Sequence, residues 1–264
     1  MSCAIHARGV RHRYPNGHLA LDGVDLHVPH GQRIAVLGPN GAGKTTLMLR
    51  LNGLLLGEGE IEVAGIRVGP KTLRDARRNV GLIFQDPDDQ LFMPTVREDV
   101  AFGPLNMGLE RAEVEQRVEL ALDAVRMGEV VDRAPHELSL GQRRRVAIAT
   151  VLAMEPTLLV LDEPSANLDP RSRRELLDVL ETIDRTLVVV THDLPFAAEL
   201  CERAVILARG RLVADGDCRD VLADDELLAA HDLELPRGFV LERVPLRGRP
   251  GDVQAPADGA RVPA

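Results

Sequence analysis

Residues 33–47 join a short apolar run to a glycine-rich loop whose composition suits phosphate binding. The run Ile34–Leu37 predicts a buried strand, and the apolar residues after Thr46 predict a helix. The loop between them reads Gly38, Pro39, Asn40, Gly41, Ala42, Gly43, Lys44 and Thr45, which is the spacing G-x-x-x-x-G-K-S/T. Its glycines let backbone N–H groups turn toward phosphate oxygens, and the helix N-terminus adds partial positive charge. We therefore predict that residues from Gly38 to Thr46 bind nucleotide phosphates, with the Lys44 ammonium on the β- and γ-phosphates and the Thr45 hydroxyl on Mg²⁺.

Two carboxylates and a histidine follow the ends of two further apolar runs. Residues 157–161 predict a buried strand that ends in Asp162 and Glu163, and residues 186–190 predict another that leads to His192. Adjacent carboxylates at the end of a buried strand are unfavourable unless a cation or hydrogen bonds hold them. The pair is therefore interpreted as a residue that supports bound Mg²⁺ from behind its direct ligands, Asp162, and a general base toward water, Glu163. His192 is either structural or directed into the same cleft, since strand ends at this edge of a sheet usually face the ligand.

Tyr14 is the only tyrosine of the chain, and it stands just before a predicted turn at residues 15–17. It lies upstream of the phosphate loop, where its ring could stack on an adenine. The alternative is an ordinary strand aromatic that packs on the core.

Gln85 ends the apolar run 80–84 and is followed by the acidic segment 86–90. Its amide oxygen could reach a metal or a water, or it could simply be the polar end of a strand. The acidic segment does not make a calcium loop, because it lacks the glycine and the late glutamate of an EF-hand.

Residues 139–152 predict a helix whose first turn is unusually basic. Ser139 is a good N-cap, and the apolar residues after position 145 predict that the rest of the helix is buried. Arg143, Arg144 and Arg145 oppose the helix dipole in this turn. They either face a bound polyanion or form a solvated face paired with local acids.

The rest of the pattern supplies the elements that position these residues. Alternating apolar residues predict strands within 4–28 and a strand pair at 59–65, and residues 204–215 predict a hairpin. Helical patterns cover 94–107, 110–127 and 170–183, of which the first two form a polar-outside insertion. From about residue 236 onward the sequence turns to Pro, Gly, Arg and Asp with little periodicity.

Composition narrows the classes of function. The chain has 264 residues, a hydrophobic fraction of 45% and a net charge of −9, which argues against general nucleic-acid binding. Three cysteines without C-x-x-C spacing indicate neither a disulfide framework nor a zinc site, so a reducing cytosol is expected. We find no apolar signal region and no apolar run of about 18 residues, so we expect attachment to a membrane only through a partner.

Taken in order, these motifs resemble the nucleotide-binding subunit of ABC transporters, over the chain to about residue 236. The matches are Tyr14, the phosphate loop GPNGAGKT, Gln85 of the Q-loop, the signature LSLGQ, the Walker B run LLVLDEP, the D-loop SANLD and the switch histidine His192. Leu140 departs from the commonest signature, which has Gly there, whereas Ser139 and Gly141 are retained.

The resemblance implies an α/β fold of the P-loop NTPase class: an ABC-type nucleotide-binding domain. This has a RecA-like core sheet, an N-terminal antiparallel β subdomain and a helical subdomain. We expect the domain to span residues 1–236, with the helical subdomain at about 87–153, and a Pro/Gly-rich, disordered tail at 237–264.

The resemblance also implies ATP and Mg²⁺ as cofactors and a head-to-tail pair of identical or related ATPase subunits. Each ATP would lie between one subunit's phosphate loop and the other's signature residues Ser139, Gly141 and Gln142. The expected catalytic residues are Glu163, His192 and Lys44. Tyr14 would stack on adenine, Thr45 and Gln85 would ligate Mg²⁺ with Asp162 behind them, and His192 would contact the γ-phosphate.

Residues 84–109 carry a narrower resemblance, to the ATPases of energy-coupling-factor importers and especially to the cobalt/nickel group. In that family the segment around residues 88–90 lies toward the coupling helices of a membrane subunit. The resemblance implies a location at the cytoplasmic face of the membrane, with an integral-membrane coupling subunit and a membrane subunit that binds the substrate. The cargo would be a transition-metal cation or a vitamin.

Three other readings share some of these motifs. A soluble ABC ATPase of DNA repair or translation usually has a second cassette or long coiled coils, which this sequence lacks. An ABC exporter ATPase would share every ATP motif and differ in the segment after the Q-loop. A regulatory module that binds ATP without hydrolysing it is disfavoured by Glu163 and His192 together.

Overall fold

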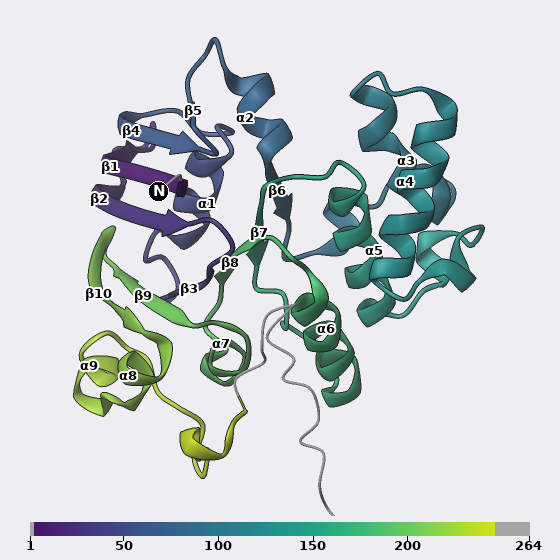
Figure 1. Ribbon diagram of the computed structural model, residues 1–264. Helices are drawn as coiled ribbons and strands as arrows, with labels where there is room; N and C mark the ends of the chain where they lie inside the picture. Colours follow the sequence, from purple (N-terminus) through teal and green to yellow (C-terminus); the bar gives the residue numbers. More distant parts are fainter. Residues whose placement is uncertain (1–2, 246–264) are drawn as a thin grey trace, which may run out of the picture.

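The computed structural model describes residues 3–245, which form two β-sheets and the helices that cover them (Figure 1). The first sheet is antiparallel with the order β2-β1-β4-β5. Its strands are β1 (Cys3–Arg13), β2 (Leu19–Pro29), β4 (Glu58–Val63) and β5 (Ile66–Arg67). Its buried side chains alternate with exposed ones along β1 and β2, as expected for a sheet with one solvated face.

The second sheet is the core sheet, and its order is β10-β9-β3-β8-β7-β6. Its strands are β3 (Arg33–Leu37), β6 (Val80–Ile83), β7 (Leu158–Asp162), β8 (Thr186–Val190), β9 (Arg203–Ala208) and β10 (Arg211–Asp217). Neighbouring strands from β9 to β6 pair in parallel, and β10 pairs antiparallel with β9. Every residue of β3, β6, β7 and β8 is buried, which explains why these strands read as continuous apolar runs.

Alternate residues of the core sheet enter two separate hydrophobic clusters, one on each face. Ile34 and Val36 face the cluster built with α1 (Lys44–Leu51) and the antiparallel sheet. Ala35 and Leu37 face the cluster on the other side of the sheet. Helices α5 (Leu140–Leu152), α6 (Pro170–Thr182), α7 (Leu194–Leu200) and α8 (Cys218–Ala223) contribute to it, together with the two helices of the lobe described below. The phosphate loop thus leaves β3 at the carboxyl edge of a sheet that is covered on both sides.

A helical lobe lies at one side of the molecule (Figure 1). It contains α3 (Val96–Asn106) and α4 (Arg111–Ala124), which pack on α5. Thr95 and Glu98 form a capping box at the start of α3. The short helices η1 (Pro87–Asp89), η2 (Gly128–Val130) and η3 (Pro135–Glu137) connect the lobe to the core. The predicted limits of the helical subdomain, 87–153, stay a prediction.

The architecture confirms the predicted arrangement of an antiparallel N-terminal sheet, a largely parallel core sheet and a helical lobe. The helices predicted at 94–107, 110–127 and 170–183 match α3, α4 and α6 to within a few residues. The sequence pattern did not predict α2 (Leu73–Asn79), α7, α8 or α9 (Asp225–Ala230). Each of these has only six or seven residues, too few to show a helical period.

The packed chain continues past the predicted domain end at residue 236. Leu241 is buried in η4 (Leu241–Arg243), and Phe239 packs against the same cluster as α8. Residues 237–245 therefore belong with the domain, contrary to the prediction of a disordered tail from 237 onward. The remainder of that predicted tail, 246–264, lies outside the described residues. Within residues 3–245, no helix is long and apolar enough to cross a membrane.

Candidate active site

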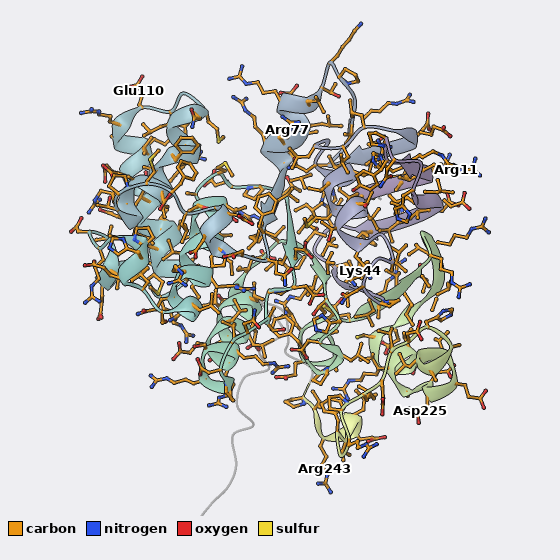
Figure 2. All side chains as sticks on the ribbon, turned by 180° about the vertical axis from the view of Figure 1, so that it is seen from behind. Arg11, Lys44, Arg77, Glu110, Asp225 and Arg243 are labelled. Atoms are coloured by element: carbon orange, nitrogen blue, oxygen red, sulfur yellow. The ribbon has the colours of Figure 1, made fainter. Side chains whose placement is uncertain are left out.

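A cleft of about 220 Å³ lies beside the phosphate loop at the carboxyl edge of the core sheet. Lys44, at the start of α1, lies between the antiparallel sheet, marked by Arg11, and the helical lobe, marked by Glu110 (Figure 2). Most of the predicted site residues line this cleft, together with two residues that were not predicted, His18 and Ala20. The predicted ones are Tyr14, Asn40, Gly41, Ala42, Gly43, Lys44, Thr45, Thr46, Gln85, Asp162 and Glu163.

At two positions of the loop, only glycine avoids a clash between a Cβ atom and a neighbouring backbone. Gly43 has a φ of +106°, and a Cβ atom there would lie 2.3 Å from the carbonyl oxygen of Ala20. Gly38 has a φ of +149°, and a Cβ atom there would lie 2.1 Å from the carbonyl oxygen of Leu207. The loop is therefore wedged against the backbones of both sheets, and its shape is fixed before any ligand is considered.

Lys44 is buried, and its ammonium group stays on the loop. Nζ donates hydrogen bonds to the carbonyl oxygens of Gly38 at 2.6 Å and Pro39 at 3.0 Å. Burial lowers the pKa of the Lys44 ammonium, while the nearby carboxylates of Glu163 and Asp162 raise it. A cation so placed, between loop amides and two carboxylates, can neutralise phosphate oxygens that enter the cleft.

Thr45 and Asp162 offer oxygen ligands suited to Mg²⁺. The Thr45 hydroxyl donates a hydrogen bond to the Asp162 carboxylate at 3.3 Å. Burial and the neighbouring Glu163 raise the pKa of Asp162, while Thr45 and Lys44 lower it. Residues 3–245 hold no cluster of three or more His, Cys, Asp or Glu side chains that could bind a metal unaided. The pair fits a Mg²⁺ ion that takes its other ligands from phosphate and water, with the exposed Gln85 on the same cleft.

Glu163 is held by the residues that follow β8. Its carboxylate accepts hydrogen bonds from the Thr191 hydroxyl at 2.9 Å and the His192 backbone N–H at 3.3 Å. The His192 Nδ1 atom lies 2.8 Å from the other carboxylate oxygen. The backbone of Glu163 is left-handed, with a φ of +45°, a conformation that is unfavourable for this residue type and needs support from its surroundings. Thr191 was not predicted, although its position between a buried strand and His192 is a signal that could have identified it.

Tyr14 is half-buried and attached to the phosphate loop. Its hydroxyl lies 3.0 Å from the Thr46 hydroxyl, and the His12 ring meets it edge-on at 4.7 Å. The ring of His18 lies nearly parallel to it, with 6.5 Å between the centroids. Of the two interpretations offered by the sequence, this position favours a ring available to a ligand over one packed in the core.

The start of α5 lies apart from this cleft. Ser139 is exposed and caps the helix, since its hydroxyl accepts from the Gln142 N–H at 3.3 Å and the Gln142 side chain accepts from the Ser139 N–H at 2.9 Å. A Cβ atom at Gly141 would lie 2.6 Å from the hydroxyl of Ser172, so α5 approaches α6 as closely as glycine allows. Ser139, Gly141 and Gln142 do not line the cleft that holds Lys44. Leu140 begins the helix without disturbing its cap.

All three arginines of this turn have partners within their own chain. Arg143 pairs with Asp88 at 3.1 Å, and Arg145 pairs with Glu175 at 3.1 Å. Arg144 is buried and donates to backbone carbonyls. Pairing with local acids is therefore right for two of the three. The carbonyls that Arg144 contacts lie some twenty residues further along the chain, and no spacing in the sequence could indicate this contact.

Comparison with known proteins gives one consistent picture. The family model for ABC transporters matches residues 21–166. A *Streptomyces avermitilis* protein with the provisional name ABC transporter ATP-binding protein is 61% identical over 89% of this chain and 90% of its own length. The energy-coupling factor transporter ATP-binding protein EcfA of *Carboxydothermus hydrogenoformans* is 46% identical over 89% of this chain and 88% of its own length.

Two solved structures share the fold. CbiO1 from *Clostridium perfringens*, described as part of the ABC transporter complex CbiONQ, has a TM-score of 0.78 and 35% identity, and the match covers 90% of this chain and 97% of that one. The ATP-binding cassette MJ0796, described as a dimer in a post-hydrolysis state bound to ADP and Pi, has a TM-score of 0.71 and 27% identity. That match covers 81% of this chain and 98% of the cassette.

Proposed function

The chain belongs to the ATP-binding proteins of ABC transporters, and on that premise we propose that it works as the ATPase of an energy-coupling-factor importer. The observation that carries the ATPase role is the meeting of Lys44, Asp162 and Glu163 in one cleft, with His192 on the Glu163 carboxylate. ATP binding and hydrolysis coupled to transport follow from the family. We propose in addition the roles of the site residues, the pairing of two subunits and the class of transporter.

Each residue of the cleft takes a role that its position supports. The loop amides and Lys44 bind the β- and γ-phosphates, and Tyr14 stacks on the adenine. Thr45 and Asp162 would hold Mg²⁺ together with Gln85, and the metal would supply charge neutralisation on the phosphate oxygens. Glu163 accepts a proton from the attacking water, and His192 both orients this carboxylate and contacts the γ-phosphate.

The signature residues serve the nucleotide of a second subunit. Ser139 is exposed at a helix N-terminus and lies outside the cleft of its own chain, which leaves it accessible to a second subunit. The dimeric MJ0796 cassette bound to ADP and Pi supports the pairing of two such subunits. Two copies, or one copy with a related chain, would thus enclose each ATP between the phosphate loop of one subunit and Ser139, Gly141 and Gln142 of the other.

Ser139→Ala is expected to slow hydrolysis about tenfold, because it removes one hydrogen bond to a charged phosphate. Nucleotide affinity of the monomer should stay unchanged, since the lost contact belongs to the partner's site. Mixing Ser139→Ala with Lys44→Ala subunits should restore activity above that of either variant alone, since each mixed dimer contains one intact site. Steady-state phosphate release measures this effect.

The control for this mixing experiment is a chain that carries both changes. Mixed with Ser139→Ala, this double variant leaves no intact site and should restore nothing. If the first mixture also stayed at the level of its components, under conditions where dimers form, the shared-site arrangement would be wrong.

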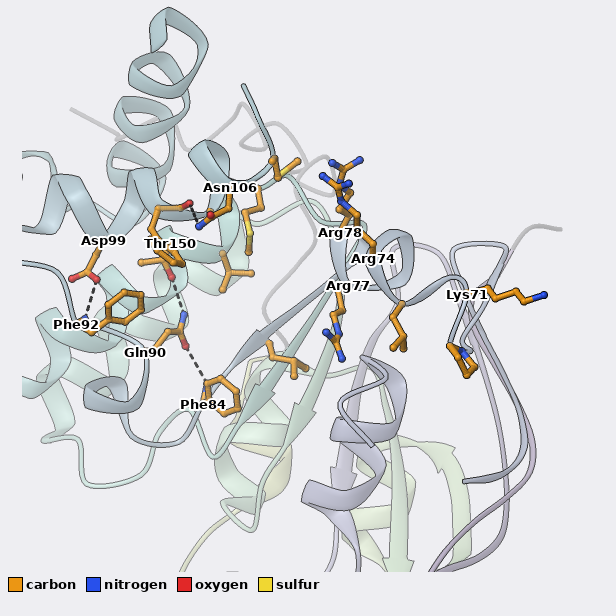
Figure 3. A pocket seen from close by; sticks show the side chains of 18 residues that line it. Lys71, Arg74, Arg77, Arg78, Phe84, Gln90, Phe92, Asp99, Asn106 and Thr150 are labelled. Carbon is orange, nitrogen blue, oxygen red and sulfur yellow. Dashed lines mark hydrogen bonds between the residues drawn. The ribbon is translucent and has the colours of Figure 1, made fainter. Parts of the chain in front are cut away.

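A groove of about 700 Å³ is the proposed docking site for the membrane coupling subunit (Figure 3). Arg74, Arg77 and Arg78 of α2 lie along one side. Phe92, which is 62% exposed, meets Phe102 edge-to-face at 5.0 Å on the other side. This combination fits an amphipathic helix that carries apolar and acidic side chains.

The groove adjoins the Q-loop through Gln90, the last residue of the segment 88–90. The Gln90 amide donates to the Ala147 carbonyl oxygen at 2.7 Å and to the Thr150 hydroxyl at 2.8 Å, both on α5. Its oxygen accepts from the Phe84 N–H at 3.3 Å (Figure 3). A helix that enters the groove would therefore touch Gln90, which links the strand before Gln85 to α5, the helix that begins with the signature residues. Through this contact the membrane subunit could affect the ATP site.

Phe92→Ala or Phe102→Ala is expected to weaken binding to the membrane subunit about tenfold or more, because aromatic anchors dominate such interfaces. The protein would be co-expressed with the membrane proteins encoded in neighbouring reading frames, and retention in the detergent-solubilised complex would be measured. ATP hydrolysis by the isolated subunits should not change.

Leu120→Ala is the matched control, since Leu120 is 59% exposed on α4 and does not line the groove. Equal loss of the complex in this variant would show a general defect of the helical lobe. Full retention of the complex in both phenylalanine variants would show that the groove is not the docking site.

The class of transporter is supported by the EcfA relative and by CbiO1, part of the CbiONQ complex. We propose a transition-metal cation, cobalt or nickel, or a vitamin as the cargo, bound by a separate membrane subunit. Proteoliposomes that contain the complex would be tested for ATP-driven uptake of labelled Ni²⁺, Co²⁺ or a panel of vitamins. ATP-driven movement in the opposite direction would identify an exporter instead.

A further inference from the structure

Arg144 is a cation in the interior of the protein. It lies in the first half of α5 and is only 2% exposed. Among residues 3–245, Asp86 is the carboxylate whose charge raises the pKa of this guanidinium, against the larger lowering by burial, and the Nε atom is buried without a hydrogen-bond partner. A guanidinium group keeps its charge under these conditions, so its burial is unfavourable unless other contacts offset it.

Three backbone carbonyls provide these contacts. One terminal nitrogen of Arg144 donates to the carbonyl oxygens of Glu163 at 2.7 Å and Pro164 at 2.9 Å. The other donates to the carbonyl oxygen of Ala166 at 3.2 Å. The segment that follows β7 is thus held by the forked end of one side chain, a geometry that the single ammonium of a lysine cannot reproduce.

The held segment has a strained backbone at both ends. Glu163 has a φ of +45° and Asn167 a φ of +60°, both in the left-handed region. Such conformations persist only where the surroundings fix them. The carboxylate of Glu163 is fixed from the side of β8 by Thr191 and His192, and its carbonyl is fixed from the side of α5 by Arg144. The direction of the proposed general base therefore depends on both contacts.

A second anchor holds the same segment without Arg144. The Ser165 hydroxyl donates to the Asp193 carboxylate at 2.7 Å, and Asp193 also accepts from Arg173 at 3.4 Å. The Glu163 N–H donates to the Val190 carbonyl oxygen at 2.8 Å. Removal of Arg144 should therefore leave the segment folded and change chiefly the orientation of its first residues.

The same helix also carries Ser139, one and a half turns before Arg144. In the shared-site arrangement proposed above, Ser139 contacts the nucleotide bound to the partner, whereas Arg144 holds the Glu163 that acts on the chain's own nucleotide. We infer that Arg144 is a positioning residue that makes hydrolysis at each site depend on the nucleotide at the other. This inference rests on the proposed function, because it requires two composite sites.

The test measures phosphate release against ATP concentration for the wild-type dimer, Arg144→Lys and Arg144→Met. The wild type should show a Hill coefficient clearly above 1. Arg144→Met should reduce the Hill coefficient to about 1 and lower kcat by about tenfold, a fold-change within the range typical of coupling between two sites. Arg144→Lys should give intermediate values of both quantities. Calorimetric nucleotide affinity of the monomer and the Tm of the dimer should stay near the wild-type values.

Arg145→Lys is the matched control in the same helical turn, since Arg145 pairs with the Glu175 carboxylate and does not touch the segment after β7. It should retain the wild-type Hill coefficient. The inference is wrong if this control loses cooperativity equally, if Arg144→Met keeps it, or if neither Arg144 variant folds, because the arginine is then merely structural.

Failure of the inference can be told apart from failure of the proposed function. A wild-type dimer that hydrolyses ATP with a Hill coefficient of 1 would overturn the role of Arg144 and leave the ATPase intact. A wild-type protein that neither dimerises with ATP nor hydrolyses it would overturn the proposed function itself, and the inference with it.

Discussion

Glu163→Gln is expected to bind ATP with near wild-type affinity and to hydrolyse it roughly 10²–10⁴ times more slowly, the range of a lost general base. The glutamine amide has nearly the same shape, and its oxygen can still accept from the Thr191 hydroxyl. It cannot take a proton from water at neutral pH. Stopped-flow nucleotide binding and steady-state phosphate release separate the two quantities.

Glu115→Gln serves as the control for this result, because Glu115 is an exposed glutamate that pairs with Arg97 on the helical lobe. It should hydrolyse ATP at the wild-type rate. Turnover at the wild-type rate in Glu163→Gln would exclude Glu163 as the base. A parallel loss of ATP binding would show that the change disturbs the cleft and would contradict a purely chemical role.

Lys44→Ala is expected to lower ATP affinity by roughly 10–10²-fold, the effect of losing a hydrogen bond to a charged group. Hydrolysis should fall by roughly a further 10²-fold, since electrostatic stabilisation of the transferring phosphoryl group is lost as well. Isothermal calorimetry with a non-hydrolysable ATP analogue measures the first effect, and phosphate release at saturating ATP measures the second.

The Lys44 change removes two hydrogen bonds to loop carbonyls. It should not unfold the loop, because Ala42 keeps its backbone hydrogen bonds to Gly210 and Pro39. Arg185→Ala removes a positive charge from an exposed site whose guanidinium donates to the carbonyl oxygen of its neighbour Asp184, and it should leave affinity unchanged. Equal ATP affinity in Lys44→Ala and wild type would contradict the phosphate-loop interpretation.

The sequence predicted well those residues whose chemistry depends on their own neighbours in the chain. The phosphate loop lies between a strand and a helix that the apolar pattern shows directly, and Asp162 and His192 stand at the ends of continuous apolar strands. Because parallel strands share one carboxyl edge, the sequence alone could indicate that these residues meet.

Contacts between distant segments could not be predicted in this way. The partners of Arg144 and the bond from Tyr14 to Thr46 join positions that only the folded chain brings together. Burial of Leu241 against the cluster around α8 is of the same kind, because the apolar run 239–241 is too short to show a helical or strand period. The three arginines of α5 are adjacent in the sequence, yet only Arg144 is buried and held by the backbone carbonyls of a distant segment.

The close approach of α5 and α6 limits how this sequence can diverge. A methyl group at Gly141 would collide with Ser172, whose hydroxyl in turn bonds the Asp169 carboxylate that caps α6. Neither position can therefore change alone. A larger residue at 141 requires a smaller residue at 172, and loss of the Ser172 hydroxyl weakens the cap of α6. We therefore expect substitutions at positions 141 and 172 to occur together in related sequences, so that the start of α5 changes only in step with the start of α6.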